Sequence, residues 1–515
     1  MKQGPPGDGV PSIPDPKDRR SMGLLAAIVA TGAGLRLATL GSRCLWSDEL
    51  STLNRALALA AGAPASSLAP SGNVPLYFWS LEAWQLGGNS EWWLRLPSVL
   101  FGVATICMAF VLARAVFDQK TALVAAALTA ASPFLVMYSQ VVRPYALVAL
   151  LSTAALVVFL RAVELNGRRH WIGFALLTTA GLYTHLFAAA VPLATTLYLV
   201  LFHRSDRHLF NTGLLAHLTV GLVFLPWAVV LFALIGSSGG STLADAVGSS
   251  LAPPWMRAAY VPFVLTLGES VSPFAWLVVI PAGVVYALSL ALGVRRGLAE
   301  TSRLWLLVLF VAVPIPLALA LVPHTQPAHF LMATIPLLIV VARGVVSLPS
   351  PAIRNVIGGL LLLLSSVSLF NYYRQDPGQV HNTATIVPWR NVVATLEQRA
   401  QPADVILFYH PYYLGLFHHY YDGALDVVPI TESDLGESLQ ARLEGLARVW
   451  LISRYHFNEP ERRAIADWMH SGFASSHVDR YLANESVIAG LRGGEANAYH
   501  ALEVTLYERR GPTHR

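Results

Sequence analysis

The chain has 515 residues, of which 55% are apolar and 13% are charged, with a formal charge of +5 and a mean hydropathy of +0.53. A soluble globular protein has roughly 25% charged residues, so this composition excludes an ordinary soluble enzyme and a disordered or fibrous protein, and it indicates a polytopic membrane protein. The two cysteines, Cys44 and Cys107, are too few for a disulfide framework or a cysteine-based zinc site.

The N-terminus is predicted to form a disordered cytoplasmic tail, residues 1–20, followed by a membrane span. The tail is rich in proline, glycine and charged residues and shows no apolar period. Met22–Leu40 is the first apolar stretch, and a cleaved signal peptide is the alternative interpretation. Arg36 inside the stretch and the lack of a small-residue cleavage site favour an uncleaved anchor.

About eleven apolar stretches are long enough to cross a bilayer. After the first, they are 96–116, 121–138, 144–162, 170–184, 186–203, 212–235, 273–294, 304–322, 328–347 and 354–372. Within residues 1–372, with the N-terminus in the cytoplasm, the cytoplasmic segments hold 16 lysines and arginines, and the opposite side with its flanks holds 6. This bias follows the positive-inside rule, and an odd number of spans places the C-terminus outside.

The composition changes after residue 372, which predicts a transmembrane domain over 21–372 and an extracytoplasmic α/β domain over 373–515. The second segment holds 17 of the 30 acidic residues and no lysine. Its β-like runs are 405–409, 427–430, 448–453 and 502–507, and its helical patterns are 391–400, 438–446 and 460–470. A G-x-G-x-x-G motif and a P-loop are both missing, so neither a nucleotide nor a nucleic acid is an expected partner.

Carboxylates gather in the first external loop, residues 41–95, which holds four of the six external acids of the membrane part. Asp48 and Glu49 follow Ser47, a good helix cap, and a pair of acids at the positive N-terminus of a helix is one interpretation. Trp46 and Leu50 add apolar surface around the pair at the membrane face. Two carboxylates in such surroundings also suit a general base or a metal ligand.

An aromatic stretch with histidines, Phe408–Tyr421, stands out in the C-terminal segment. Such side chains can form a surface that binds a sugar or an acceptor, and they can equally form the packed core of the domain. His418 and His419 are adjacent and lack the helical i, i+4 spacing of a zinc pair, so the stretch predicts no metal site.

Several short motifs follow one another along the chain. They are Trp46-Ser-Asp-Glu-Leu, Pro75-Leu-Tyr-Phe-Trp, Glu91-Trp-Trp-Leu-Arg-Leu-Pro-Ser98, Ser132-Pro-Phe-Leu-Val-Met-Tyr-Ser-Gln-Val-Val-Arg-Pro-Tyr145, Tyr183-Thr-His185 and Pro226-Trp227. In this order they resemble the polyprenyl-phosphate-sugar-dependent membrane glycosyltransferases of the GT-C class, near the dolichyl-phosphate-mannose protein mannosyltransferases and the lipid A aminoarabinose transferases. The resemblance covers residues 22–235 well and is looser beyond them. It implies a lipid-linked donor, an external active site and a bacterial inner membrane location.

The resemblance also implies roles for the first loop. Asp48 corresponds to the essential acid of the family, which positions or deprotonates the acceptor, and Glu49 to the acid that often follows it. One sugar would pass, with inversion of its anomeric carbon, to a glycan, lipid or protein acceptor, while polyprenyl phosphate leaves. Trp46, Asn73 and Tyr77 are candidates for contact with the acceptor or the sugar. An aromatic belt at the membrane interface is the alternative for the two aromatic residues.

A phosphate leaving group requires a cation or a metal, because negative charge grows on its oxygens in the transition state. Arg143 lies in a short external loop, and its guanidinium can bind phosphate with two hydrogen bonds. An arginine that only reaches toward the interface is the alternative. The further candidates for phosphate binding are Tyr138, Gln140 and Tyr145 in this loop and His185, His324 and His329 at the external ends of later spans, where a structural histidine is the alternative.

Three positions depart from the family pattern. Val141 stands where relatives often have Glu, Asn73 and Val74 precede Pro75 where relatives often have His, and His329-Phe330 replaces Arg-Tyr. A divalent metal is therefore left open, with Asp48 and Glu49 as its candidate ligands.

Two other functions compete with a transferase. A flippase for a lipid-linked glycan would show repeated halves and charges near the middle of the membrane, and the sequence shows neither. A glycan polymerase or ligase usually centres on a large external loop late in the chain, whereas here the acids lie in the first loop.

Overall fold

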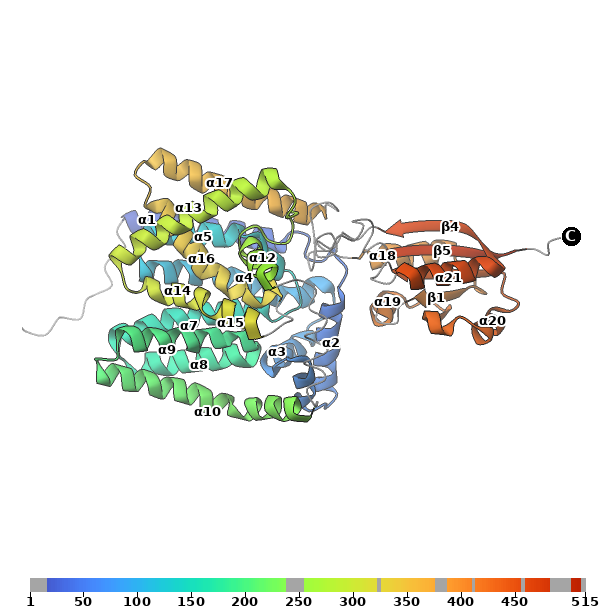
Figure 1. Cartoon of the computed structure of the whole chain (residues 1–515), viewed down its shortest axis with the longest axis horizontal. Helices are drawn as coiled ribbons and strands as arrows, with labels where there is room; N and C mark the ends of the chain where they lie inside the picture. Colours follow the sequence, from blue (N-terminus) through green and yellow to red (C-terminus); the bar gives the residue numbers. More distant parts are fainter. Residues whose placement is uncertain are drawn as a thin grey trace, which may run out of the picture.

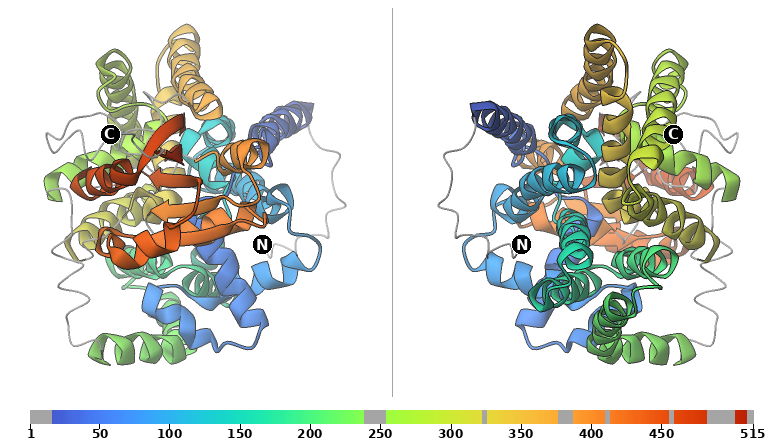
Figure 2. Two further views of the ribbon diagram at one scale, coloured as in Figure 1. Left: turned by 90° about the vertical axis from the view of Figure 1, so that its right-hand side faces the viewer. Right: turned by 90° about the vertical axis from the view of Figure 1, so that its left-hand side faces the viewer.

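The computed structural model describes residues 16–237, 254–321, 326–375, 387–409, 413–454, 459–481 and 502–510. A body of helices carries a small domain with a β-sheet at one end (Figure 1). The left view of Figure 2 looks onto this sheet domain, with the helices of the body behind it. His324 lies outside the described residues.

The helical body confirms a polytopic membrane protein. Its helices are α1 (Pro16–Leu37), α4 (Glu91–Val116), α5 (Gln119–Ala131), α6 (Pro133–Tyr138), α7 (Tyr145–Leu165), α8 (Arg168–Thr184), α9 (Ala190–Phe202), α10 (Arg207–Ser237), α12 (Pro254–Leu267), α13 (Trp276–Glu300), α14 (Leu304–Ala312), α15 (Pro314–Leu321), α16 (Thr334–Val346) and α17 (Pro351–Arg374). Within the described residues, six helical segments are long and apolar enough to cross a bilayer: α4, α7, α10, α13, α17, and α16 with the turn η3 (Pro327–Ala333) before it. The count of eleven spans stays a prediction.

Two stretches expected to be single spans are each two helices. The stretch 121–138 divides into α5 and α6, because Ser132 caps the second helix and Pro133, at its first turn, cannot donate a backbone hydrogen bond to the first. The stretch 304–322 divides into α14 and α15 at Pro314 for the same reason. Periodicity alone does not locate such breaks, since both halves are apolar.

Helices α13 and α16 approach closely through two glycines. A methyl group at Gly344 would lie 1.8 Å from the carbonyl oxygen of Ser289, and one at Gly293 would lie 2.0 Å from that of Val340. Small residues spaced four apart, as Ser289 and Gly293 are, permit such backbone contact between membrane helices.

We expect Gly344→Ala to force the two helices apart. Overpacking of this kind costs about 1–3 kcal/mol of stability. Thermal unfolding in nanodiscs, followed by tryptophan fluorescence, should show a lower midpoint for this variant. Gly283→Ala is the matched control, because it lies on α13 and a methyl group there would meet nothing within 4 Å. An equal midpoint for the two variants would contradict the prediction.

The first external loop folds into short helices at the end of the body. These are α2 (Ser47–Ala60), the turn η1 (Ala65–Ser71) and α3 (Pro75–Gln85), which lie beside the sheet domain (Figure 1). The expected cap Ser47 is instead the first helical residue, and Trp46 holds the cap position. Its amide donates to Glu49 Oε2 at 3.3 Å, so a carboxylate one turn into the helix satisfies a backbone donor that the helix leaves free.

The sheet domain contains a five-stranded sheet of order β2-β1-β3-β5-β4. Its strands are β1 (Val405–Tyr409), β2 (Asp426–Ile430), β3 (Arg448–Arg454), β4 (Phe473–Tyr481) and β5 (Leu502–Arg509), and its helices are α18 (Trp389–Arg399), α19 (Leu414–Tyr420), α20 (Glu437–Leu443) and α21 (Glu459–Gly472), with the turn η6 (Glu432–Asp434). Strands β2, β1 and β3 run parallel, and β5 is antiparallel to β3 and β4. The strands expected from the sequence are confirmed, whereas β4 and α19 are additional.

The central strand β1 is buried on both of its faces. Ile406 and Phe408 of β1 pack in a cluster with α18 and α19, while Leu407 and Tyr409 pack on the other face with α20 and α21. This alternation follows from the two-residue period of a strand. Much of the Phe408–Tyr421 stretch therefore forms packed core.

The sheet domain is joined to the helical body by a shared cluster and by polar contacts. Leu45 and Leu53 of the first loop belong to the same buried cluster as α18 and α19. Tyr420 accepts a hydrogen bond from the amide of Leu45 at 2.5 Å and donates one to Glu91 at 2.5 Å. Arg390 pairs with Glu91 as well. Contacts from the sheet domain therefore hold the N-terminal end of α2 in place.

Candidate active site

Asp48 and Arg143 form an ion pair at the N-terminal end of α2. Asp48 Oδ2 and Arg143 Nη2 are 3.5 Å apart, although 95 residues separate them in the sequence. The Asp48 side chain remains 32% exposed and that of Arg143 14%. A carboxylate and a guanidinium are thus available side by side at a place that a ligand can reach.

Other contacts hold Arg143 against α2. Its Nη1 donates to the hydroxyl of Thr52 at 3.1 Å and its Nη2 to that of Tyr145 at 3.2 Å. Its Nε is buried and has no acceptor among the described residues, and the same holds for the indole Nε1 of Trp46. A buried donor without an acceptor is costly.

Aromatic rings surround Arg143 on the side of the membrane helices. The guanidinium lies 5.4 Å from the ring of Tyr145, which packs on Tyr138 at 5.1 Å, His185 at 5.6 Å and His329 at 6.3 Å. Burial, and then His329 and Arg143, lower the pKa of His185 well below its usual 6.5. His185 is therefore neutral near pH 7 and serves as a hydrogen-bonding group rather than as a cation.

Glu49 turns away from Asp48 into a closed network. Its carboxylate accepts from Arg95 Nε at 2.9 Å and Nη2 at 2.8 Å, and from the amide of Val142 at 2.8 Å. Both charged side chains are almost completely buried, at 0% and 2% exposure. The remaining Arg95 donors bind the carbonyl oxygens of Leu40, Arg43 and Cys44.

This network ties the two loops of the site together. Arg95 holds the segment before α2, and Glu49 holds the backbone next to Arg143 through Val142. Asp48 and Arg143 are therefore placed relative to each other by a buried ion pair that neither of them joins.

Gln140 and Arg36 anchor the Arg143 loop from the other side. Gln140 Nε2 donates to three carbonyl groups near the end of α1, the shortest contact being 2.6 Å to Ala38. Arg36 is completely buried and donates to the Ser139 hydroxyl at 3.2 Å and to carbonyl groups of Gly32, Thr129 and Ala130. These contacts indicate an anchoring role for Gln140, which turns toward α1 and away from Arg143.

The other candidates of the first loop lie on α3 or just before it, and Tyr77 interacts electrostatically with Arg143. Tyr77 is 2% exposed on α3, and burial raises the pKa of its hydroxyl, so the group stays protonated. Asn73 precedes α3, and its amide donates to the carbonyl of Leu68 at 3.3 Å.

Thr52, Arg95 and Ser139 belong to the site region but were not expected from the sequence. Thr52 lies one helical turn after Asp48, which is the signal that could have indicated it. Arg95 lies in the quoted Glu91–Ser98 motif, but the sequence does not show which acid it pairs with.

The residues present do not fit a resident divalent ion. The oxygens of Glu49 are engaged by Arg95 and by the Val142 amide, and the carboxylate of Asp48 is paired with Arg143. Across the part of the chain that the structure describes, three or more His, Cys, Asp or Glu side chains are nowhere grouped to hold a metal. Oxygen-rich ligand sets of the kind that Mg²⁺ or Ca²⁺ requires are not formed here.

Comparisons with known proteins confirm the resemblance to GT-C glycosyltransferases. Residues 70–232 match the model of a family described as dolichyl-phosphate-mannose-protein mannosyltransferase. No curated protein matches the sequence significantly.

Solved structures share the fold at low sequence identity. ArnT from Cupriavidus metallidurans, bound to undecaprenyl phosphate, matches with a TM-score of 0.53 and 12% identity, over 94% of this chain and 98% of that one. An oligosaccharyltransferase from Archaeoglobus fulgidus, tethered to an acceptor peptide, matches with a TM-score of 0.53 and 13% identity, over 89% and 73%. At these identities the likeness concerns the fold.

Proposed function

We propose that this protein transfers one sugar from a polyprenyl-phosphate donor to an acceptor outside the cytoplasm. The observation that carries the proposal is the Asp48–Arg143 pair, in which an accessible carboxylate lies 3.5 Å from a guanidinium with an unsatisfied Nε. A fold shared with ArnT bound to undecaprenyl phosphate supports the choice of a lipid phosphate. The expected site is the external face of a bacterial inner membrane, with the sheet domain on that side.

The chemistry assigns one task to each side chain. Asp48 accepts the proton of an acceptor hydroxyl, whose oxygen attacks the anomeric carbon of the donor. The bond from that carbon to the phosphate oxygen breaks, and polyprenyl phosphate leaves with the bonding electrons. Arg143 binds the phosphate and stabilises the charge that grows on it. Displacement from the opposite face inverts the anomeric carbon.

The remaining residues have supporting roles in this proposal. Tyr145, Tyr138, His185 and His329 form the wall around Arg143 and offer neutral hydrogen-bonding groups to the phosphate. The burial of the Glu49 carboxylate against Arg95 supports a positioning role for Glu49 in this proposal.

The direct test uses purified protein in nanodiscs with undecaprenyl phosphate linked to mannose, glucose, arabinose or galactose. Mass spectrometry follows the release of undecaprenyl phosphate in the presence of cell-envelope extract as the acceptor source. Release from one donor supports a transferase and identifies the sugar. If none of these donors releases undecaprenyl phosphate, the flippase and polymerase alternatives gain weight over this proposal.

We expect EDTA to leave this turnover unchanged within about twofold, a difference well under 1 kcal/mol. The reason is the ligand set, in which Glu49 is already paired with Arg95. Turnover is measured with EDTA, and again after adding Mg²⁺ or Mn²⁺ back. A loss that an added metal ion reverses would contradict this prediction.

Arg143→Ala should mainly weaken the binding of the donor. Hydrogen bonds to charged groups contribute about 1.5–3 kcal/mol, which corresponds to a donor KM raised about ten- to a hundredfold. Steady-state kinetics with a varied donor concentration measure this change. Arg143→Lys is the matched control, since it keeps the charge and should retain part of the affinity. An unchanged donor KM in the alanine variant would exclude the phosphate role.

A further inference from the structure

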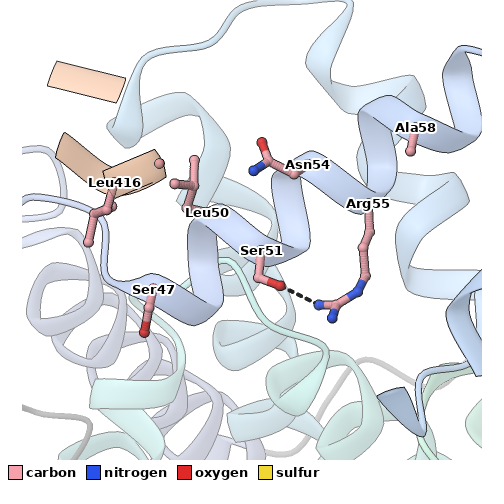
Figure 3. A pocket seen from close by; sticks show the side chains of 8 residues that line it. Ser47, Leu50, Ser51, Asn54, Arg55, Ala58 and Leu416 are labelled. Carbon is pink, nitrogen blue, oxygen red and sulfur yellow. Dashed lines mark hydrogen bonds between the residues drawn. The ribbon is translucent and has the colours of Figure 1, made fainter. Parts of the chain in front are cut away.

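A pocket of about 430 Å³ lies between α2 and the sheet domain, outside the Asp48–Arg143 pair (Figure 3). From α2, the pocket is lined by polar side chains that include Ser47, Ser51, Asn54 and Arg55. Leu50 of α2 and Leu416 of α19 add an apolar part. The volume falls within the usual range for sites that bind small ligands.

The pocket and Arg143 lie on opposite sides of Asp48. Successive residues of a helix are rotated by about 100°, so Thr52 lies about 40° to one side of Asp48, and Ser51 lies about 60° to the other side. Thr52 is the residue that contacts Arg143, whereas Ser51 lines the pocket. Asp48 therefore separates a side that suits a phosphate from a side that is open to a second ligand.

The lining of the pocket matches the chemistry of a carbohydrate. Hydroxyl groups of Ser47 and Ser51, the amide of Asn54 and the guanidinium of Arg55 supply both donors and acceptors of hydrogen bonds. Arg55 donates to the Ser51 hydroxyl, which orients both groups along one wall (Figure 3). Leu50 and Leu416 offer apolar surface to the C–H face of a sugar ring.

We propose that this pocket binds the acceptor through a hydroxyl-rich glycan segment. The inference rests on the proposed function and extends it, because it assigns an acceptor class and a subsite. An acceptor sugar in the pocket would direct a hydroxyl toward Asp48 from the side opposite to Arg143. The sheet domain takes part in acceptor recognition by closing the pocket with α19.

Two substitutions fill the pocket from its two walls. Ala58 lines the pocket from an exposed position on α2, so Ala58→Trp adds bulk without disturbing a packed core. Gly415 lines it from α19, and a Cβ atom there would have Leu50 Cδ2, at 3.9 Å, as its nearest neighbour, so Gly415→Leu also has room. Leu57→Trp is the matched control, because Leu57 is 53% exposed on α2 and does not line the pocket.

The experiment separates the acceptor from the donor. Undecaprenyl phosphate binding is measured by native mass spectrometry, and transfer to cell-envelope extract by product formation. Ala58→Trp and Gly415→Leu should lower transfer at least about tenfold, and undecaprenyl phosphate binding should stay within about twofold. Leu57→Trp should change neither quantity. Unchanged transfer in the filled variants, or an equal loss in the control, would overturn the proposal.

A measurement of oligosaccharide binding tests the pocket assignment without relying on turnover. Saturation-transfer NMR on the full chain in nanodiscs uses soluble oligosaccharides of mannose, glucose, galactose and arabinose. We expect at least one of them to bind, and Ala58→Trp to remove the signal while Leu57→Trp retains it. Binding without release of undecaprenyl phosphate would reject the transferase and retain the pocket. If none of the oligosaccharides binds, the pocket assignment is wrong even when the transferase is active.

Discussion

Asp48→Asn is expected to lower sugar transfer by about 10²–10⁴-fold, the usual contribution of a general base. Asparagine keeps the size of the side chain and can still accept a hydrogen bond, but it cannot take the proton of the acceptor hydroxyl. Release of undecaprenyl phosphate from its sugar-linked form measures the loss. The fold should persist, because a partly exposed ion pair such as Asp48–Arg143 contributes about 0–1 kcal/mol.

The control for this variant is Glu82→Gln. Glu82 is an acidic residue of the same external loop, on α3, and it is partly exposed. Glu82→Gln removes one negative charge, as Asp48→Asn does. A general effect of charge on the binding of an anionic donor would therefore appear in both variants. Near-normal turnover of Asp48→Asn, at unchanged donor binding, would exclude Asp48 as the base.

Glu49→Gln should have the largest effect on stability. The change leaves Arg95 charged and buried without a counter-ion, which costs about 3–5 kcal/mol when one partner of a buried pair is removed. Thermal unfolding in nanodiscs should show a clearly lower midpoint. Turnover should fall with the midpoint, because the amides of Val142 and Trp46 lose the carboxylate that accepts a hydrogen bond from each of them.

A second variant separates structure from catalysis. In Glu49→Gln/Arg95→Met, neither side chain is charged, so most of the lost stability should return. If Glu49 only positions the loops, part of the turnover should return as well. A Glu49→Gln protein with normal stability and no turnover would instead support the catalytic role expected from the sequence.

The adjacent acids Asp48 and Glu49 illustrate what the sequence alone does not predict. Asp48 and Glu49 differ by one position, yet about 100° of helical rotation directs one to Arg143 and the other to Arg95. The local sequence marks both as candidates, since both precede an apolar helix. Which one is accessible depends on partners that lie 46 and 95 residues away.

In the sheet domain, too, some elements could be predicted from the sequence and others could not. Strand β1 could be predicted because its five residues, Val405–Tyr409, form a continuous run of β-branched, aromatic and leucine side chains, as a strand covered on both faces requires. Strand β4 could not, because its residues Phe473–Tyr481 are mostly polar and partly exposed at the edge of the sheet. The pocket between α2 and α19 combines segments that are more than 350 residues apart.

The buried position of Arg36 has a consequence for how the chain is assembled in the membrane. Arg36 lies in the last turn of α1, and a charged side chain buried within a membrane helix bundle needs polar partners. Its partners beyond its own helix are Thr129, Ala130 and Ser139. These residues are synthesised about 90 to 100 residues later. Helix α1 therefore gains these contacts only after α5 and α6 have entered the bilayer.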